Sequence, residues 1–381
     1  MMDKLYIIRG EYEPNSAPHN RLLSYLNVFE KCGIKTELIF VFPNRLGIKP
    51  NFQYKYIKTS YLYEASRFFY NRIIAKLFAP LLFYGFIKYK LNAGDKVLAL
   101  NASGIMLKML KKSGKVILCH ETTEHPDVNN WRVQKLKQIY VDSCKYVDGL
   151  FVISTALKEY FISVGVPEEK ITIVNMTVEP TRFEGVRKDP TVERYIAYCG
   201  TASNNKDGVN KLIEAFGLVA PKHKDVKLYI VGNTPSASDE SGNLQLIESL
   251  GLKDRVVFTG VVPAADMPQL LTNAAVLALA RPDNLQAKNG FPTKLGEYLL
   301  TGNPVVVTKV GDIPLFLKDG ESALLAEAGN SQEFADKLCW ALENPEEALV
   351  IGGKGREVAM RNFNSINETQ KIINILGLEC D

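Results

Sequence analysis

The 381-residue sequence is poor in the residues that build metal and redox sites. Only four histidines are present, and no two of the six cysteines form a C-x-x-C pair. The cysteines are scattered and several fall within strand or helix patterns, so we expect buried, reduced thiols and a cytoplasmic protein. The six positions are Cys32, Cys119, Cys144, Cys199, Cys339 and Cys380.

Long apolar runs and a strong charge imbalance are missing as well. No window of 18 residues is apolar and uncharged, so we expect no membrane-spanning helix. The formal net charge of +4 is by itself too small to indicate nucleic-acid binding. The opening residues, MMDKLYIIRG, lead directly into a strand pattern, so we expect no signal peptide. These features indicate a globular protein of two or three domains.

Strand and helix patterns alternate along the chain. The apolar residues 5–8 form a strand, residues 20–31 have apolar side chains at helical spacing, and residues 36–42 form the next strand. A strand–helix–strand unit of this kind requires a parallel sheet, which predicts the α/β class. The pattern restarts at residues 195–198, after a charged stretch at 179–189 that contains Pro and Gly and reads as a linker between domains.

The stretch NGFPTKLGEYLLTGNPVVV, residues 289–307, organises the second half. Pro292 opens a helix predicted over residues 293–300, Gly302 suits a left-handed cap, and an apolar strand follows. The N-terminus of a helix offers free N–H groups and a positive dipole to a diphosphate. Lys294 and Glu297 fall on one face of this helix. A nucleotide sugar could be held by such an arrangement, with the cation beside its phosphates and the carboxylate, one turn deeper, accepting hydrogen bonds from its ribose hydroxyls.

This stretch resembles the donor-binding motif of family-4 glycosyltransferases of the GT-B fold, in which two acidic residues are separated by seven. The second acid matches Glu297, and the first falls on Asn289, which is a departure. The Gly-Phe-Pro-Thr-Lys variant resembles a subset of these enzymes from bacterial polysaccharide pathways. The alternative is one βα unit of any Rossmann-like domain.

The resemblance implies the GT-B fold, with two Rossmann-like domains facing each other across a cleft. It places an acceptor-binding domain at residues 1–178 and a nucleotide-sugar-binding domain at residues 190–362. The C-terminal helix, about residues 363–381, is expected to cross back onto the first domain.

The second domain also resembles the family in its phosphate-binding loop, which here contains Gly200, Lys206 and Gly208. The family usually has an Arg directly after the first Gly. Here that residue is Thr201, and Lys294 is the candidate replacement for the missing cation. The loop after a later strand is expected to stack on the nucleobase through Val261, Val262 and Pro263. The donor-binding candidates are Gly200, Thr201, Lys206, Val262, Gly290, Phe291, Pro292, Thr293, Lys294 and Glu297.

The acceptor-side candidates follow strands of the first domain. His120 resembles a cleft histidine of the family, and Glu121 and Glu124 could accept hydrogen bonds from an acceptor hydroxyl. The alternatives for this segment are a metal site, although the paired helical spacing of a known metal motif is missing, and a solvated loop without a role. Further cleft candidates are Arg9, Gly10, His19 and Arg21, with surface charge the favoured interpretation of Arg21.

The mechanism implied is sugar transfer from a nucleotide-diphosphate donor to the hydroxyl of a carbohydrate or lipid-linked acceptor, with retention at the anomeric carbon. No cofactor or metal is expected, and no Asp-x-Asp pair is present. The catalytic candidates are Lys206, Lys294, Asn289 and His120. Two alternatives stay open: a non-catalytic binding protein, which Asn289 and Thr201 would support, and a sugar-nucleotide epimerase of the same fold.

Residues 53–90 combine many aromatic side chains with Lys and Arg, and Glu64 is their single acid. Basic residues beside aromatics suit a helix lying on an anionic membrane surface, which would make the protein peripheral on the inner face of the membrane. The alternative is a pair of ordinary helices packed on the sheet, with the Lys stems along apolar surface. Nucleic-acid binding is not expected, because no recognised nucleic-acid module accompanies this composition.

Overall fold

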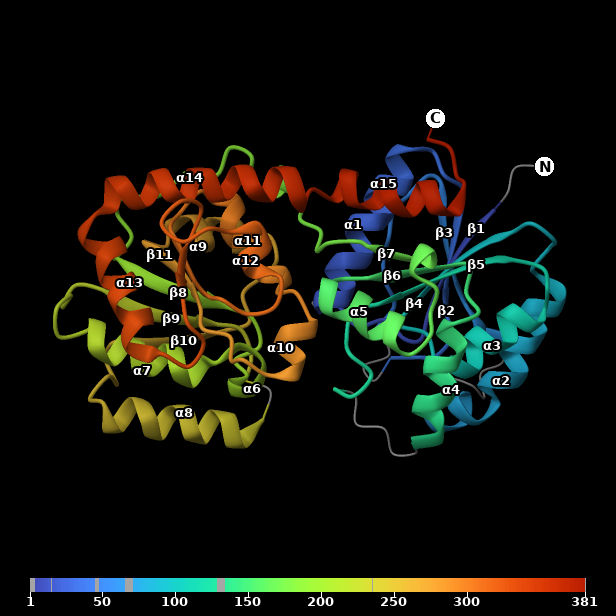
Figure 1. The fold of residues 1–381 in the computed structure, drawn as a ribbon, viewed down its shortest axis with the longest axis horizontal. Helices are drawn as coiled ribbons and strands as arrows, with labels where there is room; N and C mark the ends of the chain where they lie inside the picture. Colours follow the sequence, from blue (N-terminus) through green and yellow to red (C-terminus); the bar gives the residue numbers. More distant parts are fainter. Residues whose placement is uncertain are drawn as a thin grey trace. The chain divides into compact units, whose positions relative to one another are not determined.

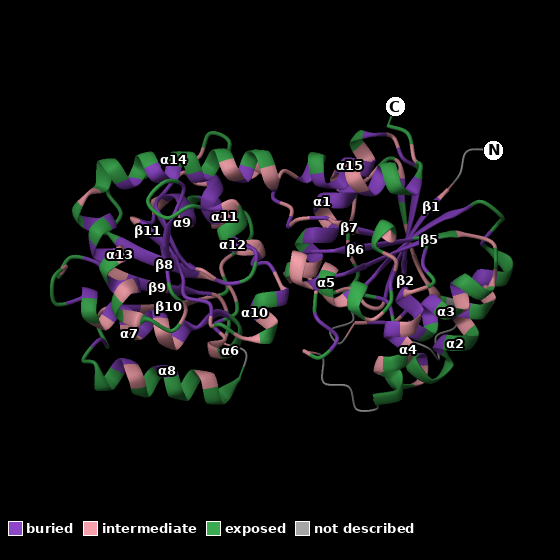
Figure 2. Cartoon of the chain, viewed as in Figure 1, coloured by how far each residue is buried: buried purple, intermediate pink, exposed green. Residues whose placement is uncertain are grey.

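The computed structural model describes residues 4–14, 16–44, 48–65, 71–128, 134–234 and 236–380. The chain divides into two compact units, Met1–Asn175 with Ser365–Asp381, and Met176–Asn364. Each unit has a central sheet with helices packed around it (Figure 1). The inner strands of both units are buried, as Figure 2 shows, which explains their near-continuous apolar sequences.

The first unit is built on a parallel sheet that spreads in both directions from β1. Among the described residues the sheet has seven strands in the order β3-β2-β1-β4-β5-β6-β7. The loops after β1 and β4 therefore flank a switch point, where open α/β sheets bind ligands. The strands are β1 (Leu5–Arg9), β2 (Thr36–Phe40), β3 (Ile57–Tyr61), β4 (Lys96–Leu100), β5 (Ile117–Thr122), β6 (Gly149–Val152) and β7 (Ile171–Ile173).

The helices of the first unit include the last helix of the chain. In Figure 1, α15 lies beside α1, and the two share a hydrophobic core in which Leu22 and Phe29 are fully buried with Ile372. The predicted return of the C-terminal helix to the first domain is confirmed. The helices are α1 (Ala17–Lys31), α2 (Arg72–Tyr89), α3 (Gly104–Lys112), α4 (Gln134–Cys144), α5 (Thr155–Ser163) and α15 (Ser365–Leu376).

The prediction that the cysteines are reduced is wrong for one pair. Cys32, which follows α1, and Cys380, which follows α15, form a disulfide with their Cα atoms 4.4 Å apart. The packing of α15 on α1 brings these cysteines together although 348 positions separate them in the sequence. The other four are free, within the described part of the chain, and burial raises the pKa of Cys119 and Cys144 to about 12.

The second unit repeats the topology of the first. In its described residues a sheet of six parallel strands has the order β10-β9-β8-β11-β12-β13, so its switch point lies between β8 and β11. The strands are β8 (Tyr195–Cys199), β9 (Lys227–Val231), β10 (Val256–Gly260), β11 (Val276–Leu279), β12 (Val305–Thr308) and β13 (Leu324–Ala326). The helices are α6 (Asn204–Asp207), α7 (Val209–Val219), α8 (Ala237–Ser249), α9 (Met267–Asn273), α10 (Leu285–Asn289), α11 (Thr293–Leu300), α12 (Ile313–Phe316), α13 (Ser331–Glu343) and α14 (Pro345–Asn362).

Several predicted elements differ from the structure in detail. The sequence also predicts a turn at residues 289–291, but Asn289 is the last residue of a short helix, α10, which the Asn284 side chain caps by accepting a hydrogen bond from the Ala287 N–H. Pro292 is the N-cap residue of α11 and not its first helical residue. The sequence also predicts a helix over residues 130–144, which the structure describes from Gln134 on, and residues 130–133 lie outside the described part.

The charged stretch at 179–189 lies within the second unit, where Pro180–Phe183 forms a short 3-10 helix. Within the described ranges, no helix is both long enough and apolar enough to cross a membrane.

Candidate functional site

The donor-side candidates of the second unit gather at the switch point of its sheet. β8 delivers Gly200 and the loop leading to α6, while β11 delivers Ala280 and Arg281. The two segments are in close contact, because a Cβ atom added to Gly208 would overlap the carbonyl oxygen of Ala280. Gly208 also has a φ of 67°, which favours glycine. The loop predicted to bind phosphate is therefore held against the segment after β11.

Lys294, in the first turn of α11, reaches this loop. Its ammonium group lies against Gly200, where an added Cβ atom would collide with it. The same group forms an ion pair with Asp207 and donates a hydrogen bond to the Tyr198 hydroxyl at 3.0 Å. Lys294 and Gly200, both donor-side candidates, thus lie in contact, and the partnership of Lys294 with Asp207 is a feature that the sequence analysis missed.

Burial controls the charges of this pair. It lowers the pKa of Lys294, and the attraction of Asp207 offsets only part of that effect. Burial of Asp207 opposes its ionisation, but the charge and hydrogen bond of Lys294 and a hydrogen bond from Tyr198 outweigh it, so the pKa of Asp207 is lowered. Only 17% of the Lys294 side chain and 3% of the Asp207 side chain are exposed. An ionised, nearly buried pair therefore stands at the predicted phosphate site.

Glu297 lies one turn further along α11 and pairs with Arg182. The Arg182 guanidinium also donates a hydrogen bond to the Ala264 carbonyl at 3.1 Å. Arg182 belongs to the stretch predicted as a linker, and nothing in its local sequence signals this contact. The carboxylate predicted to bind ribose hydroxyls is partly exposed and held in place by a cation.

The other donor-side candidates differ in how accessible they are. Thr201 and Lys206 are exposed, and Val262 is half-buried in the loop after β10. Phe291 is buried against Phe316 and Phe363, so its side chain serves the core and only its backbone could face a ligand. Gly290 and Thr293 are half-buried and Pro292 is buried.

Asn289 is buried at the end of α10, and its amide nitrogen donates a hydrogen bond to the Leu285 carbonyl at 2.9 Å. One amide hydrogen of Asn289 is therefore used in a hydrogen bond within α10. The contact of Asn289 with the donor sugar stays a prediction.

Arg281 is a residue of this site that the sequence analysis missed. Its side chain follows β11 directly and is only 2% exposed. Its signal in the sequence is a lone cation at the end of the apolar run AVLALA.

On the first unit, the structure contradicts the prediction that His120 is presented on a loop. His120 lies within β5 and is fully buried. Its ring nitrogens are 2.9 Å from the Ala99 carbonyl oxygen and 3.1 Å from the Tyr140 hydroxyl. Burial lowers its pKa to about 4, so the ring is neutral at pH 7. β5 continues beyond His120 to Thr122, so His120 is a core residue in this structure.

Glu121 and Arg21 also differ from their predictions. Both side chains are 4% exposed and they pair with each other at 2.9 Å, so Arg21 is not a surface charge and the Glu121 carboxylate is engaged by Arg21. Arg21 further donates to the carbonyls of Val174 and Asn175, at 2.9 and 2.7 Å. This pair ties α1 to β5 and to the segment after β7.

The remaining acceptor-side and cleft candidates of the first unit differ in burial. Gly10 is half-buried, Arg9 and His19 are buried, and Glu124 is exposed. Burial lowers the pKa of His19 to about 4, with a contribution from Arg9. Asn101, directly after β4, has a φ of 49°, a left-handed conformation that clusters at functional sites.

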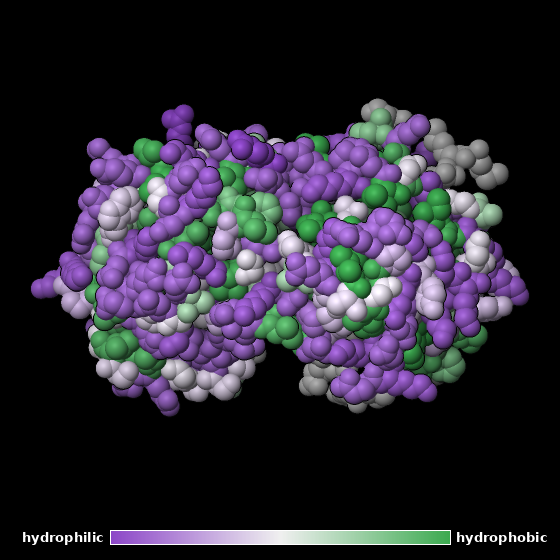
Figure 3. All heavy atoms as spheres, viewed as in Figure 1, coloured by the Kyte–Doolittle hydropathy of each residue, from purple (hydrophilic) through white to green (hydrophobic). Residues whose placement is uncertain are grey.

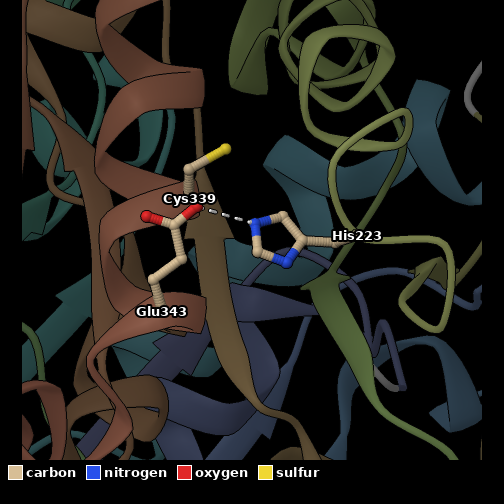
Figure 4. A group of neighbouring side chains, drawn as sticks. All are labelled: His223, Cys339 and Glu343. Carbon is tan, nitrogen blue, oxygen red and sulfur yellow. Dashed lines mark ion pairs between the residues drawn. The ribbon is translucent and has the colours of Figure 1, made fainter.

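Among the described residues, one group could hold a metal ion. His223, Cys339 and Glu343 bring their ligand atoms within 4.8 Å of one another, and Figure 4 shows the imidazole facing the carboxylate. His223 lies just before β9, whereas the donor-side loops follow the carboxyl ends of the strands. A cation bound there would not touch the phosphate-binding candidates.

Comparisons with known proteins agree with this geometry. The family described as glycosyl transferases group 1 matches residues 193–344. Over 157 residues the chain is 29% identical to N-acetyl-alpha-D-glucosaminyl L-malate synthase of Bacillus anthracis, covering 41% of this chain and 38% of that protein. Over 232 residues it is 24% identical to the amylovoran biosynthesis glycosyltransferase AmsK of Erwinia amylovora, covering 60% and 55%. The chain thus spans between about two-fifths and somewhat over half of these relatives.

The fold is shared with solved structures over nearly the whole chain. The crystal structure of Anabaena Alr3699/HepE in complex with UDP has a TM-score of 0.74 and 18% sequence identity, covering 99% of this chain and 100% of that one. The predicted GT-B fold class is confirmed. The match to the glycosyl transferases group 1 family at residues 193–344 contains Gly200, Lys294 and Glu297.

Proposed function

We propose that this protein is a glycosyltransferase that moves a sugar from a nucleotide-diphosphate donor to a hydroxyl of a carbohydrate or lipid-linked acceptor, in the synthesis of a cell-surface polysaccharide or glycoconjugate. The observation that carries the proposal is the convergence of Lys294, the Gly200 loop and the N-terminus of α11 on one point. A departing diphosphate needs stabilisation of its negative charge, and this is what a helix N-terminus and a cation supply.

We further propose a retaining, metal-independent reaction. The bond between the anomeric carbon and the phosphate oxygen breaks, and the acceptor oxygen bonds to that carbon on the same face. The acceptor proton passes to the departing phosphate, so no covalent nucleophile is required. Lys206 and Lys294 would balance the charge that develops on the diphosphate.

The test is turnover of a panel of UDP-, GDP- and ADP-sugars. Release of the nucleoside diphosphate that depends on an acceptor supports transfer. Donor binding without turnover would support the non-catalytic alternative, and inversion at C-2 of the donor sugar would support the epimerase. Activity that persists in EDTA is expected for the metal-independent mechanism.

Glu297→Ala is expected to weaken donor binding by about one to two orders of magnitude. Without the Glu297 carboxylate, the ribose hydroxyls of the bound donor would lose their hydrogen-bond acceptor, which costs about 1–3 kcal/mol of binding free energy per buried hydrogen bond. Calorimetry with the nucleoside diphosphate measures this. Because Arg182 loses its partner too, Arg182→Met serves as the matched control. Equal affinities of wild type and Glu297→Ala would refute the role given to this carboxylate.

We also propose that α2 docks on an anionic membrane surface. Its outer face carries Ile73, Leu77 and Leu81, which are 73%, 72% and 64% exposed. Lys76 and Lys88 are exposed on the same helix. Figure 3 shows apolar atoms gathered over this part of the first unit. A helix with an exposed apolar stripe and flanking lysines matches a membrane interface in both polarity and charge.

The inner face of α2 packs on the unit as the alternative interpretation expected, with Phe83 buried. Residues 66–70 of the predicted basic and aromatic stretch lie outside the described residues. The cytoplasmic location stays a prediction, and the disulfide weakens the argument from reduced thiols on which it rested.

The double variant Leu77→Asp with Leu81→Asp is expected to abolish co-sedimentation with phosphatidylglycerol vesicles. Each leucine contributes about 1.5–3 kcal/mol when buried in lipid, and each added carboxylate is repelled by the anionic surface. Leu244→Asp, at a 50% exposed leucine of α8, is the control. Retained binding of the double variant would rule out this surface, and equal binding of wild type to phosphatidylcholine vesicles would rule out anionic lipid as its partner.

A further inference from the structure

Arg281 is the most unusual charged residue of the second unit. It is only 2% exposed, and its Nε and Nη1 atoms are buried with no hydrogen-bond partner among the described residues. Native proteins satisfy most buried donors, so an unmet guanidinium calls for an explanation such as a ligand. Burial lowers the pKa of Arg281, although Asp207 and Tyr198 favour its charge.

The backbone of Arg281 is fixed at the switch point. Its carbonyl accepts a hydrogen bond from the Thr308 hydroxyl at 2.8 Å. The preceding residue, Ala280, is packed against Gly208. A little further along, the Asn284 side chain donates to the Asn205 carbonyl at 2.6 Å. These contacts aim the side chain at α6 and at the turn before α11, where Nη2 lies 3.9 Å from the point at which a Gly290 side chain would begin.

The charges around Arg281 are not balanced. Asp207 already forms an ion pair with Lys294, and it is also the acid that acts on Arg281. Two cations therefore share one carboxylate, which leaves a net positive charge in a nearly buried place. An anion would supply both the missing charge and the missing acceptors.

We infer that Arg281 binds the diphosphate of the nucleotide-sugar donor and, together with Lys294, supplies the positive charge that Thr201 does not provide. This inference rests on the proposed function and assigns a further residue to the same site. The α11 N-terminus and Lys294 approach the phosphates from one side, and Arg281 approaches from the segment after β11. The planar guanidinium can donate two parallel hydrogen bonds to phosphate oxygens, which an ammonium group cannot.

The experiment compares wild type, Arg281→Met and Arg281→Lys by calorimetry with three probes: the nucleoside diphosphate that binds wild type, its nucleoside, and inorganic pyrophosphate. Arg281→Met is expected to weaken binding of the diphosphate and of pyrophosphate at least tenfold and to leave nucleoside binding unchanged. Arg281→Lys should recover part of the loss. Arg194→Met, which removes a partly exposed arginine paired with Asp225, is the control.

Thermal unfolding without ligand separates this role from a structural one. Because Arg281→Met removes donors that have no partner, the variant should unfold at the same temperature as wild type or higher. A clear drop in unfolding temperature with unchanged pyrophosphate affinity would overturn the inference and make Arg281 a structural residue. Equal loss of binding for the nucleoside and for the nucleoside diphosphate would also overturn it, because Arg281 would then not act on the phosphates. If wild type binds neither nucleotides nor pyrophosphate, both the proposed function and this role of Arg281 are refuted.

Discussion

Replacing Lys294 by Met is expected to lower kcat by about two to three orders of magnitude, the loss typical of removing one preorganised donor from a developing oxyanion. Lys294 lies in the first turn of α11 and its ammonium group contacts Gly200. Its positive charge would therefore act on the departing diphosphate. The negative charge on the departing diphosphate grows in the transition state, so kcat should fall more than KM rises. Steady-state kinetics on the donor identified by the panel measure this.

The Lys294→Met variant also leaves Asp207 buried without its partner, which destabilises the second unit. The double variant Lys294→Met with Asp207→Asn removes that charge, so its stability should recover while its kcat stays low. Lys206→Ala is a second test, because Lys206 is exposed and takes part in no ion pair within the described ranges. It should lower kcat without changing stability. Recovery of activity in the double variant would show that Lys294 serves only to hold Asp207.

The sequence predicted the fold well because its signals are local. The helix at residues 293–300 has the predicted bounds, since Pro292 precedes it, Gly302 follows it and a short apolar period lies between them. The disulfide between Cys32 and Cys380 was missed, because no periodic pattern relates positions 348 apart.

The candidate site was predicted in part for the same reason. Lys294 and Glu297 were found through their spacing on one helix. Their partners Asp207 and Arg182 lie 87 and 115 positions away and became visible only when the strands brought them together. His120 was misplaced because a polar run after an apolar strand reads as a loop, whereas β5 continues through His120 and Glu121 to Thr122.

Glu121→Ala is expected to reduce the free energy of unfolding of the first unit by about 3–5 kcal/mol, the cost of leaving a buried charge unpaired. The Glu121 carboxylate accepts hydrogen bonds from Arg21 Nε and Nη2 at 3.0 and 2.9 Å and from the Tyr25 hydroxyl. Removing it leaves the Arg21 guanidinium bound only to backbone carbonyls of residues 174 and 175. Urea unfolding followed by circular dichroism measures the change.

A catalytic role for Glu121 would give a different pattern. Glu124→Ala, at an exposed position three residues further on, is the control and should change stability by less than about 0.5 kcal/mol. The double variant Arg21→Met with Glu121→Leu replaces the ion pair by apolar side chains of similar size, so it should recover most of the stability that Glu121→Ala loses. If Glu121→Ala folds as stably as wild type yet loses activity, the original assignment of Glu121 to the acceptor site is correct and the structural role argued from its contacts is wrong.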